Sequence, residues 1–115
     1  MANRVAIFGD TALSDEVENF LSQRGVNFLR VGKYLDYHNE EVLIEIGISR
    51  DISIVFLLMK SVEENIFLTL SIRVLDPTIH IFAKAGNQEE NEKLKLAGAN
   101  AILDYNKLIA QELFL

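Results

Sequence analysis

The sequence predicts an α/β fold, a doubly wound parallel sheet of five strands enclosed by helices in a three-layer αβα arrangement. Two observations predict it. Short apolar runs alternate five times with amphipathic segments along the 115 residues, and the first run is apolar at every position, as expected of a parallel strand covered on both faces. Strands joined by helices imply right-handed crossovers, for which we expect the strand order 2-1-3-4-5. The length predicts one domain over residues 1–115.

Each element is justified by its local pattern. The apolar runs have the length of strands. The expected strands are residues 5–8, 26–31, 52–59, 79–83 and 101–103. Helices are indicated by apolar residues at helical spacing, by glycines that end them, and by Ser61 and Glu64, which have capping-box spacing. The expected helices are residues 13–25, 40–46, 63–75, 87–98 and 107–115.

The helix over residues 63–75 has more apolar side chains than one buried face requires. Leu68 and Ile72 fall outside the set that the sequence places on one side. That set is Ile66, Phe67, Leu70, Val74 and Leu75. The segment 107–115 is also strongly apolar. Surplus apolar surface marks an interface, so we expect a homodimer or a larger oligomer; the alternative is that these residues fill the core. The first helix is expected to carry Leu13, Val17, Phe20 and Leu21 on its apolar side.

Charge and composition exclude several classes of protein. The net charge of −6 argues against a nucleic-acid-binding protein, which would cluster Lys and Arg. No apolar run approaches the roughly 18 residues of a membrane span, and residues 1–4 lack a signal peptide's apolar stretch. The chain has no cysteine, which fits a reducing cytosol. His38 and His80 share no metal-ligand spacing. We therefore expect a cytoplasmic protein without direct membrane insertion and without a bound metal.

The turn after the first strand is where a Rossmann-type dinucleotide-binding domain carries the pattern G-x-G-x-x-G. Its glycines make the turn, admit the pyrophosphate and let helix and strand pack closely. Here Gly9 keeps the first position, whereas Thr11 and Ser14 replace the other two and Asp10 adds a negative charge. Residues 30–33 include no acid that could hold a ribose. Two interpretations stay open, a modified nucleotide pocket at the helix terminus or an inherited turn that only packs. We expect NAD binding to be weak or absent.

Four stretches of the chain match a known sequence pattern. They are DYHNEEVL at 36–43, SVEEN at 61–65, IHIFAKA at 79–85 and EENEKLKLAGANAI at 89–102. The last resembles the E-x-L-x-x-A-G-A-D-x-V-I stretch of the RCK (regulator of potassium conductance) family, also called the TrkA-N nucleotide-binding domain. The first resembles the family's G-D-A-T-D-E-E-V-L, with Leu35 in place of the glycine. The resemblance covers most of the chain and implies a regulatory domain of a potassium channel or potassium uptake system, which assembles as dimers or larger rings.

The resemblance also implies which residues would bind a nucleotide. Lys84 matches a position where nucleotide-binding members often carry a basic residue, and Asp36 matches the pocket edge; the alternatives are a solvated lysine and a turn or cap residue. Lys84 and Gly86 stand where calcium-sensing members have carboxylates, so a calcium site is not implied. The connection 32–35 is shorter than the family's by one β/α unit, which removes part of the adenosine side of the pocket. The candidate binding residues are Gly9, Asp10, Thr11, Gly32, Lys33, Asp36 and Lys84. The implied ligand is an adenine nucleotide, NAD/NADH or ATP/ADP, bound weakly.

Catalysis is not expected. The carboxyl ends of the strands offer Asp10, Met59, Lys84 and Asp104, without a Ser/His/Asp order, an H-E-x-x-H motif or a P-loop. The alternative to the potassium-linked domain is a degenerate receiver-like interaction module, because response regulators share the topology. A working receiver needs an aspartate where Met59 stands and a lysine where Asp104 stands.

Overall fold

The computed structural model describes residues 4–32 and 36–104, and strands alternate with helices throughout. The elements are β1 (Val5–Phe8), α1 (Ala12–Gln23), β2 (Phe28–Val31), α2 (Glu40–Glu45), β3 (Ile54–Leu57), α3 (Val62–Leu75), β4 (His80–Ala85), α4 (Gln88–Ala97) and β5 (Ala101–Asp104). The strands expected at 26–31 and 52–59 are shorter than their apolar runs. The helix expected at 107–115 lies outside the described residues.

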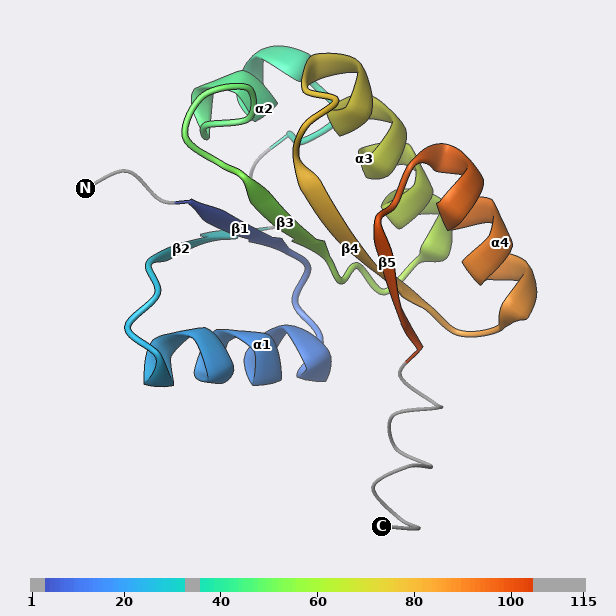
Figure 1. The fold of residues 1–115 in the computed structure, drawn as a ribbon, viewed down its shortest axis with the longest axis horizontal. Coiled ribbons are helices and arrows are strands. Elements are labelled where there is room, and N and C mark those ends of the chain that lie inside the picture. Colours follow the sequence, from blue (N-terminus) through green and yellow to red (C-terminus); the bar gives the residue numbers. More distant parts are fainter. Residues whose placement is uncertain (1–3, 33–35, 105–115) are drawn as a thin grey trace, which may run out of the picture.

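The five strands form one parallel sheet in the order β2-β1-β3-β4-β5, which confirms the predicted topology. Helix α1 lies on one face, whereas α2, α3 and α4 lie on the other (Figure 1). From β1 the chain first adds β2 on one side. It then returns to add β3, β4 and β5 in turn on the other side of β1. This reversal makes the carboxyl ends of β1 and its two neighbours the place where a crevice is expected.

Alternate strand residues supply two hydrophobic cores, one on each face. All four residues of β1 are buried. Ala6 and Phe8 belong to the larger core under α2, α3 and α4, and Val5 and Ile7 to the smaller core under α1. The sheet is therefore fully covered at β1, where it carries helices on both sides.

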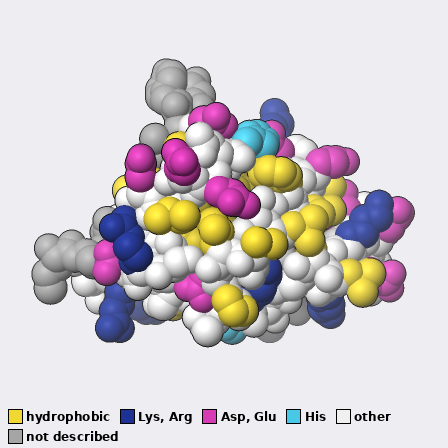
Figure 2. Space-filling model, turned by 90° about the horizontal axis from the view of Figure 1, so that it is seen from above, with side chains coloured by type: hydrophobic (Ala, Val, Ile, Leu, Met, Phe, Trp, Pro, Cys, Tyr) yellow, Lys and Arg dark blue, Asp and Glu magenta, His cyan; other side chains and the backbone are white. Residues whose placement is uncertain are grey.

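Helix α3 buries only part of the side that its sequence singles out, because Ile66 and Leu75 pack against the larger core whereas the other three residues are exposed. Phe67, Leu70 and Val74 are 38%, 51% and 77% exposed, and Figure 2 shows hydrophobic side chains gathered in a band on this face of the molecule. The side that packs on the sheet contains Asn65, Leu68, Thr69 and Ile72. Two polar residues are buried there because both are hydrogen-bonded. The side-chain amide of Asn65 binds the backbone of Met59, two residues after β3, and of Lys84 in β4, and the hydroxyl of Thr69 donates to the carbonyl of Asn65 at 2.7 Å.

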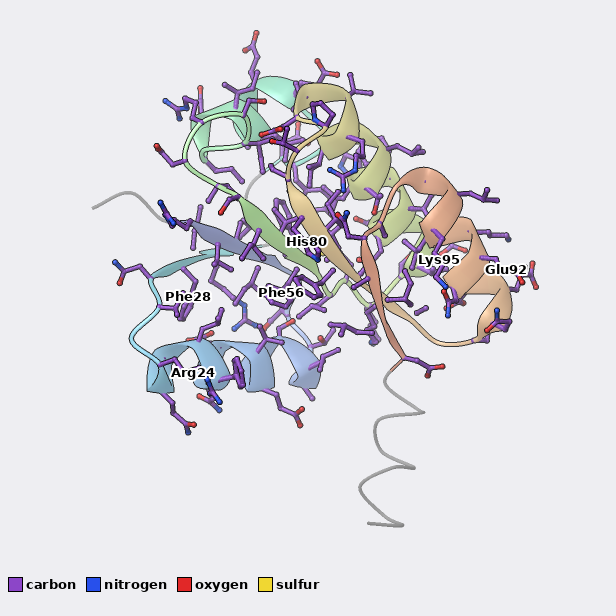
Figure 3. The ribbon with its side chains drawn as sticks, in the orientation of Figure 1. Arg24, Phe28, Phe56, His80, Glu92 and Lys95 are labelled. Atoms are coloured by element: carbon purple, nitrogen blue, oxygen red, sulfur yellow. The ribbon has the colours of Figure 1, made fainter. Side chains whose placement is uncertain are left out.

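Helix α1 buries Leu13 and Leu21, as expected, but Phe20 is 53% exposed. The guanidinium of Arg24 lies 3.5 Å from the centre of the Phe20 ring, which gives this exposed aromatic a cation–π partner. Figure 3 shows Phe28 and Phe56 pointing from the sheet toward the side on which α1 lies. Among the described residues, no helix is long and apolar enough to cross a bilayer.

Candidate functional site

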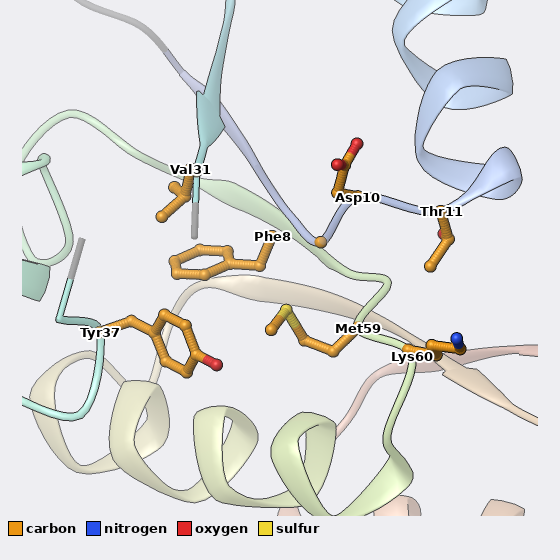
Figure 4. Close-up of a pocket in the computed structure, with 9 residues that line it drawn as sticks. Phe8, Asp10, Thr11, Val31, Tyr37, Met59 and Lys60 are labelled. Atoms are coloured by element: carbon orange, nitrogen blue, oxygen red, sulfur yellow. The ribbon is translucent and has the colours of Figure 1, made fainter. Parts of the chain in front are cut away.

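A pocket with a volume of about 180 Å³ opens at the carboxyl ends of β1, β2 and β3 (Figure 4). This is the position at which the strand order reverses. Its lining residues come from the ends of the three strands, from the turns that follow β1 and β3, and from the segment before α2. They are Phe8, Gly9, Asp10, Thr11, Val31, Gly32, Tyr37, Met59 and Lys60.

The turn between β1 and α1 requires a glycine at its first position. Gly9 has a φ of +120°, in the region that L side chains rarely adopt. A Cβ atom at Gly9 would lie 2.3 Å from the carbonyl oxygen of Leu58. The glycine therefore lets the turn pass directly against the chain that leaves β3, and this close approach closes one end of the pocket.

The tip of α1 is capped by its own side chains. The Thr11 hydroxyl accepts from the Ser14 amide at 3.4 Å, and the Ser14 hydroxyl accepts from the Thr11 amide at 3.2 Å. Thr11 also donates to the Leu58 carbonyl at 3.2 Å. This is a capping box, and it occupies the two positions at which the dinucleotide pattern has glycine. Two amide groups at the helix tip are thus already paired inside the protein.

One arginine pairs with three acidic groups beside this turn. The Asp10 side chain is 91% exposed and lies 3.3 Å from the guanidinium of Arg30. Arg30 also pairs with Asp15 at 3.3 Å and with Glu18, and its Nε donates to the Gly9 carbonyl at 3.2 Å. Arg30 therefore connects β2 to the start of α1, in the region where a dinucleotide-binding domain carries its ribose-binding acid.

The opposite wall of the pocket is apolar and is held from α3. The Tyr37 hydroxyl donates to the carboxylate of Glu64. Burial, together with the hydrogen bond and the negative charge of Glu64, raises the pKa of Tyr37 to about 12, so the phenol stays a neutral donor at ordinary pH. Met59 is fixed by the buried Asn65, whose Oδ1 accepts from the Met59 amide at 3.0 Å. Lys60 supplies a positive charge at the rim.

Four of the seven candidate residues line this pocket: Gly9, Asp10, Thr11 and Gly32. Lys33 lies outside the described residues. Asp36 accepts a hydrogen bond from the His38 amide at 3.3 Å, which is a turn contact. Lys84 lies on β4 outside the pocket lining, and its carbonyl accepts from Asn65 at 3.2 Å.

The sequence did not indicate Tyr37 or Lys60. Tyr37 reaches the pocket through the fold of the segment before α2, and no local motif marks it. Lys60 could have been found, because it follows Met59 directly at the end of a strand beside the switch point. No group of three or more potential metal ligands occurs within the residues that the structure describes.

The fold and the pocket define a Rossmann-like α/β domain with a crevice at its switch point. The family model for the TrkA-N domain matches residues 13–104, and the chain belongs to this family. The resemblance seen in the sequence is thereby confirmed.

The chain is similar to one potassium channel protein and to two structures of the channel GsuK. It is 43% identical over 68 residues to "Probable potassium channel protein 2" of Methanocaldococcus jannaschii, an alignment that covers 59% of this chain and 20% of the relative. A structure described as the GsuK channel bound to NAD is 26% identical with a TM-score of 0.84, over 96% of this chain and 22% of that one. A structure of GsuK bound to ADP is also 26% identical with a TM-score of 0.84, over 97% and 33%. The chain therefore spans between a fifth and a third of the length of these relatives.

Proposed function

We propose that this chain is a cytoplasmic regulatory domain of a potassium channel or potassium uptake system, and that its pocket binds an adenine nucleotide weakly. Its relatives are a potassium channel protein and a channel seen with NAD and with ADP. The observation that carries the proposal is the pocket at the switch point, whose first wall is the Gly9–Thr11 turn, just before the segment that the family model matches. Regulation would follow from a difference in ligand affinity between two arrangements of the assembled domains.

The pocket favours one nucleotide over a dinucleotide. Its volume of about 180 Å³ is below the roughly 300–1,000 Å³ typical of small-molecule sites. Asp10 places a negative charge beside the helix tip, and Thr11 and Ser14 pair with each other there. Asp10 and the Thr11–Ser14 pair oppose the pyrophosphate of ADP and of NAD alike, which makes binding weak, and the small volume further disfavours the larger NAD. The site is therefore a degenerate form of a dinucleotide pocket.

Calorimetry with ADP and with NAD tests this site. We expect ADP to bind with a dissociation constant above about 100 µM and NAD more weakly still. Asp10→Asn removes a charge that faces the phosphates, and it should tighten ADP binding about fivefold, since two charges about 4 Å apart in water interact by roughly 1 kcal/mol. Asp15→Asn is the matched control, because Asp15 also pairs with Arg30 but does not line the pocket.

A second pair of variants distinguishes the pocket from the rest of the sheet edge. Lys60→Ala should weaken ADP binding several-fold, whereas Lys84→Ala should leave it unchanged, because Lys84 lies outside the lining. Micromolar NAD affinity in the unchanged protein would contradict the degenerate site. No heat of binding with ADP, in the unchanged protein or in Asp10→Asn, would exclude a nucleotide site here.

The receiver-like alternative is tested by phosphorylation. The residue two positions beyond β3 is Met59, which cannot accept a phosphoryl group. We expect no labelling by acetyl phosphate in the presence of magnesium. Labelling of the protein would favour a receiver-like function over a nucleotide-binding regulatory domain.

We infer that the exposed side of α3 is where the domain associates with a second copy. A helix that is apolar on all sides is normally buried, yet Phe67, Leu70 and Val74 of α3 are exposed. Figure 2 shows hydrophobic side chains gathered on this face of the molecule. A stripe along one helix is suited to a two-fold interface, in which the same patch of each copy meets itself.

Sedimentation tests the association. We expect a dimer or larger species at concentrations on the order of tens of micromolar. Leu70→Glu should give monomer, because association would bury an unpaired charge. Phe20→Glu is the matched control, since Phe20 on α1 is 53% exposed and Leu70 is 51% exposed. A monomeric parent protein, or an assembled Leu70→Glu variant, would exclude this interface.

A further inference from the structure

The side chains that line the pocket divide into an apolar group and a polar group. The apolar group gathers around one space and consists of Phe8, Val31, Tyr37 and Met59 (Figure 4). The polar group lies beside it, on the turns that follow β1 and β3, and consists of Asp10, Thr11 and Lys60. Phe8 and Val31 are buried, whereas Asp10 and Lys60 are exposed. A ligand at this site therefore meets an apolar surface inside and charged side chains at the rim.

The apolar group presents an aromatic ring that is held in place. The hydroxyl of Tyr37 donates to Glu64 of α3, and the Tyr37 ring packs against that of His38, with centroids 4.7 Å apart. Met59, whose amide is bound by Asn65, places a thioether opposite this ring (Figure 4). Aromatic rings bind the flat face of a nucleobase by stacking, and a thioether adapts to such a surface. This part of the pocket is suited to an uncharged ring system.

The backbone amides that a phosphate would use at the two turns are already paired. The Thr11 amide donates to the Ser14 hydroxyl, and the Ser14 amide donates to the Thr11 hydroxyl. That hydroxyl itself donates to the carbonyl of Leu58. On the turn after β3, the Met59 amide donates to the side chain of Asn65 at 3.0 Å. A phosphate at either turn would have to break one of these hydrogen bonds, because each of these groups has one proton to donate.

The charges around the pocket also disfavour an anion. Among the described lining residues, Lys60 supplies one positive charge and Asp10 one negative charge. Arg30 adds no excess positive charge, because its guanidinium pairs with three carboxylates. The net charge of the whole chain is −6, which repels an anionic ligand over a longer range. Each phosphate added to a ligand in this pocket should therefore weaken its binding.

We infer, building on the nucleotide site proposed above, that the pocket recognises the nucleoside part of its ligand and leaves the phosphates in solvent. An uncharged nucleoside such as adenosine then binds more tightly than AMP, and AMP more tightly than ADP. A phosphate-binding turn gives the opposite order, because its free amides and helix tip stabilise the phosphates. The ligand class that this pocket fits best is a nucleoside.

Calorimetry with adenosine, AMP and ADP on the full chain tests this order. We expect adenosine to bind about fivefold more tightly than ADP at low salt, because the phosphates place negative charge beside Asp10. The difference should narrow at about 1 M NaCl, where the Debye length falls to about 3 Å. Asp10→Asn should reduce the preference for adenosine over ADP about fivefold. Asp15→Asn is the matched control and should leave the preference unchanged, because Asp15 also pairs with Arg30 but does not line the pocket.

A second pair of variants tests the apolar group. Tyr37→Ala should weaken adenosine binding roughly tenfold, since it removes the ring on which the base stacks. Tyr37→Phe keeps the ring and should retain most of the affinity. Circular dichroism of each variant shows whether it folds. Equal losses in the two folded variants would show that the hydroxyl rather than the ring supports binding, and would contradict stacking of the base at Tyr37.

The results separate nucleoside recognition from the nucleotide site itself. If ADP bound as tightly as adenosine or more tightly, the preference for a nucleoside would be wrong and the nucleotide site would stand. If adenosine bound and ADP gave no heat, in the unchanged protein and in Asp10→Asn, nucleoside recognition would stand and nucleotide binding would be excluded. If neither ligand bound, both would be excluded.

Discussion

Helices α1 and α3 lie on opposite faces of the sheet, and they are packed against it to different extents. On α1, Leu13 and Leu21 are 6% and 8% exposed and belong to a core of five buried residues. On α3, Leu68 and Ile72 are completely buried in the larger core. The apolar contribution to the attachment of α3 is therefore the greater of the two.

Each helix is also held by one arginine, but the acceptors differ in charge. Arg30 binds α1 through the carboxylates of Asp15 and Glu18. Arg73 projects from α3 and donates to neutral backbone carbonyls, at 2.9 Å to Gly98 and 3.3 Å to Pro77. An arginine thus acts mainly through ion pairs on the α1 face of the sheet, and an arginine on the α3 face acts through neutral acceptors.

This difference bears on the two walls of the pocket. The wall formed by the α1 turn depends on ion pairs at the surface, which salt weakens. The wall formed by Tyr37 and Met59 depends on hydrogen bonds to α3, one of them from the buried Asn65. We therefore expect the α1 wall to respond more readily to solution conditions.

The same substitution in each helix gives the largest expected contrast. Leu68→Ala should lower the free energy of unfolding by about 3–5 kcal/mol, because it leaves a cavity in a closed core. Leu21→Ala should lower it by about 2 kcal/mol, because Leu21 lies at the margin of the smaller core. Urea unfolding of both variants measures the two losses. Equal losses would show that the helices are packed alike.

The arginines give a smaller contrast that depends on salt. Arg73→Met leaves backbone carbonyls unpaired and should lower the free energy of unfolding by roughly 2 kcal/mol at any salt concentration. Arg30→Met should lower it by roughly 1 kcal/mol at low salt and by less at about 1 M NaCl, where the Debye length falls to about 3 Å. Urea unfolding at the two salt concentrations measures both. If about 1 M NaCl reduced the loss of stability in Arg73→Met as strongly as in Arg30→Met, Arg73 would act through charged rather than neutral acceptors.

The comparison also shows what the sequence could predict. The strand order and the positions of the strands follow from the alternation of apolar runs, and the structure confirms them. For α1, the apolar residues fall on one side, and Leu13 and Leu21 are buried as expected. For α3, apolar residues occur all round the helix, so periodicity defines no unique buried side. The side that packs includes Asn65, whose amide binds the carbonyl of Lys84, and Thr69, whose hydroxyl binds the carbonyl of Asn65 within the helix.

Part of the candidate site was predictable for a similar reason. Gly9, Asp10 and Thr11 belong to a local motif, and the motif's place at the switch point brings them to the pocket. Lys84 follows the same logic of strand ends, but β4 is two strands from β1 in the sheet. Tyr37 depends on the path of the chain before α2 and on its bond to Glu64, which joins residues 27 apart. No local pattern encodes such a contact.

The smallest expected effect is on stability at alkaline pH. It tests the pocket wall formed by Tyr37, which is hydrogen-bonded to Glu64 of α3. The pKa of Tyr37 is raised to about 12 in the folded protein, against about 10 in an unfolded chain. The folded state therefore holds the phenolic proton more tightly. Its contribution to stability is complete below about pH 10 and is lost as the pH rises from about 10 through about 12. The Tyr37→Phe variant should be less stable than the unchanged protein at neutral pH. It should also lack the loss of stability that titration of Tyr37 causes between about pH 10 and about pH 12.

The unfolding free energies are compared between variants that differ at one residue, so that the contributions of all other titratable groups cancel. Glu64→Gln is the informative control. Burial is the largest cause of the raised pKa, followed by the hydrogen bond to Glu64 and its charge. Glu64→Gln should therefore keep part of the alkaline loss, and Tyr37→Phe should keep none of it. If Glu64→Gln abolished the loss completely, the charge of Glu64 rather than burial against α3 would be what holds the Tyr37 proton.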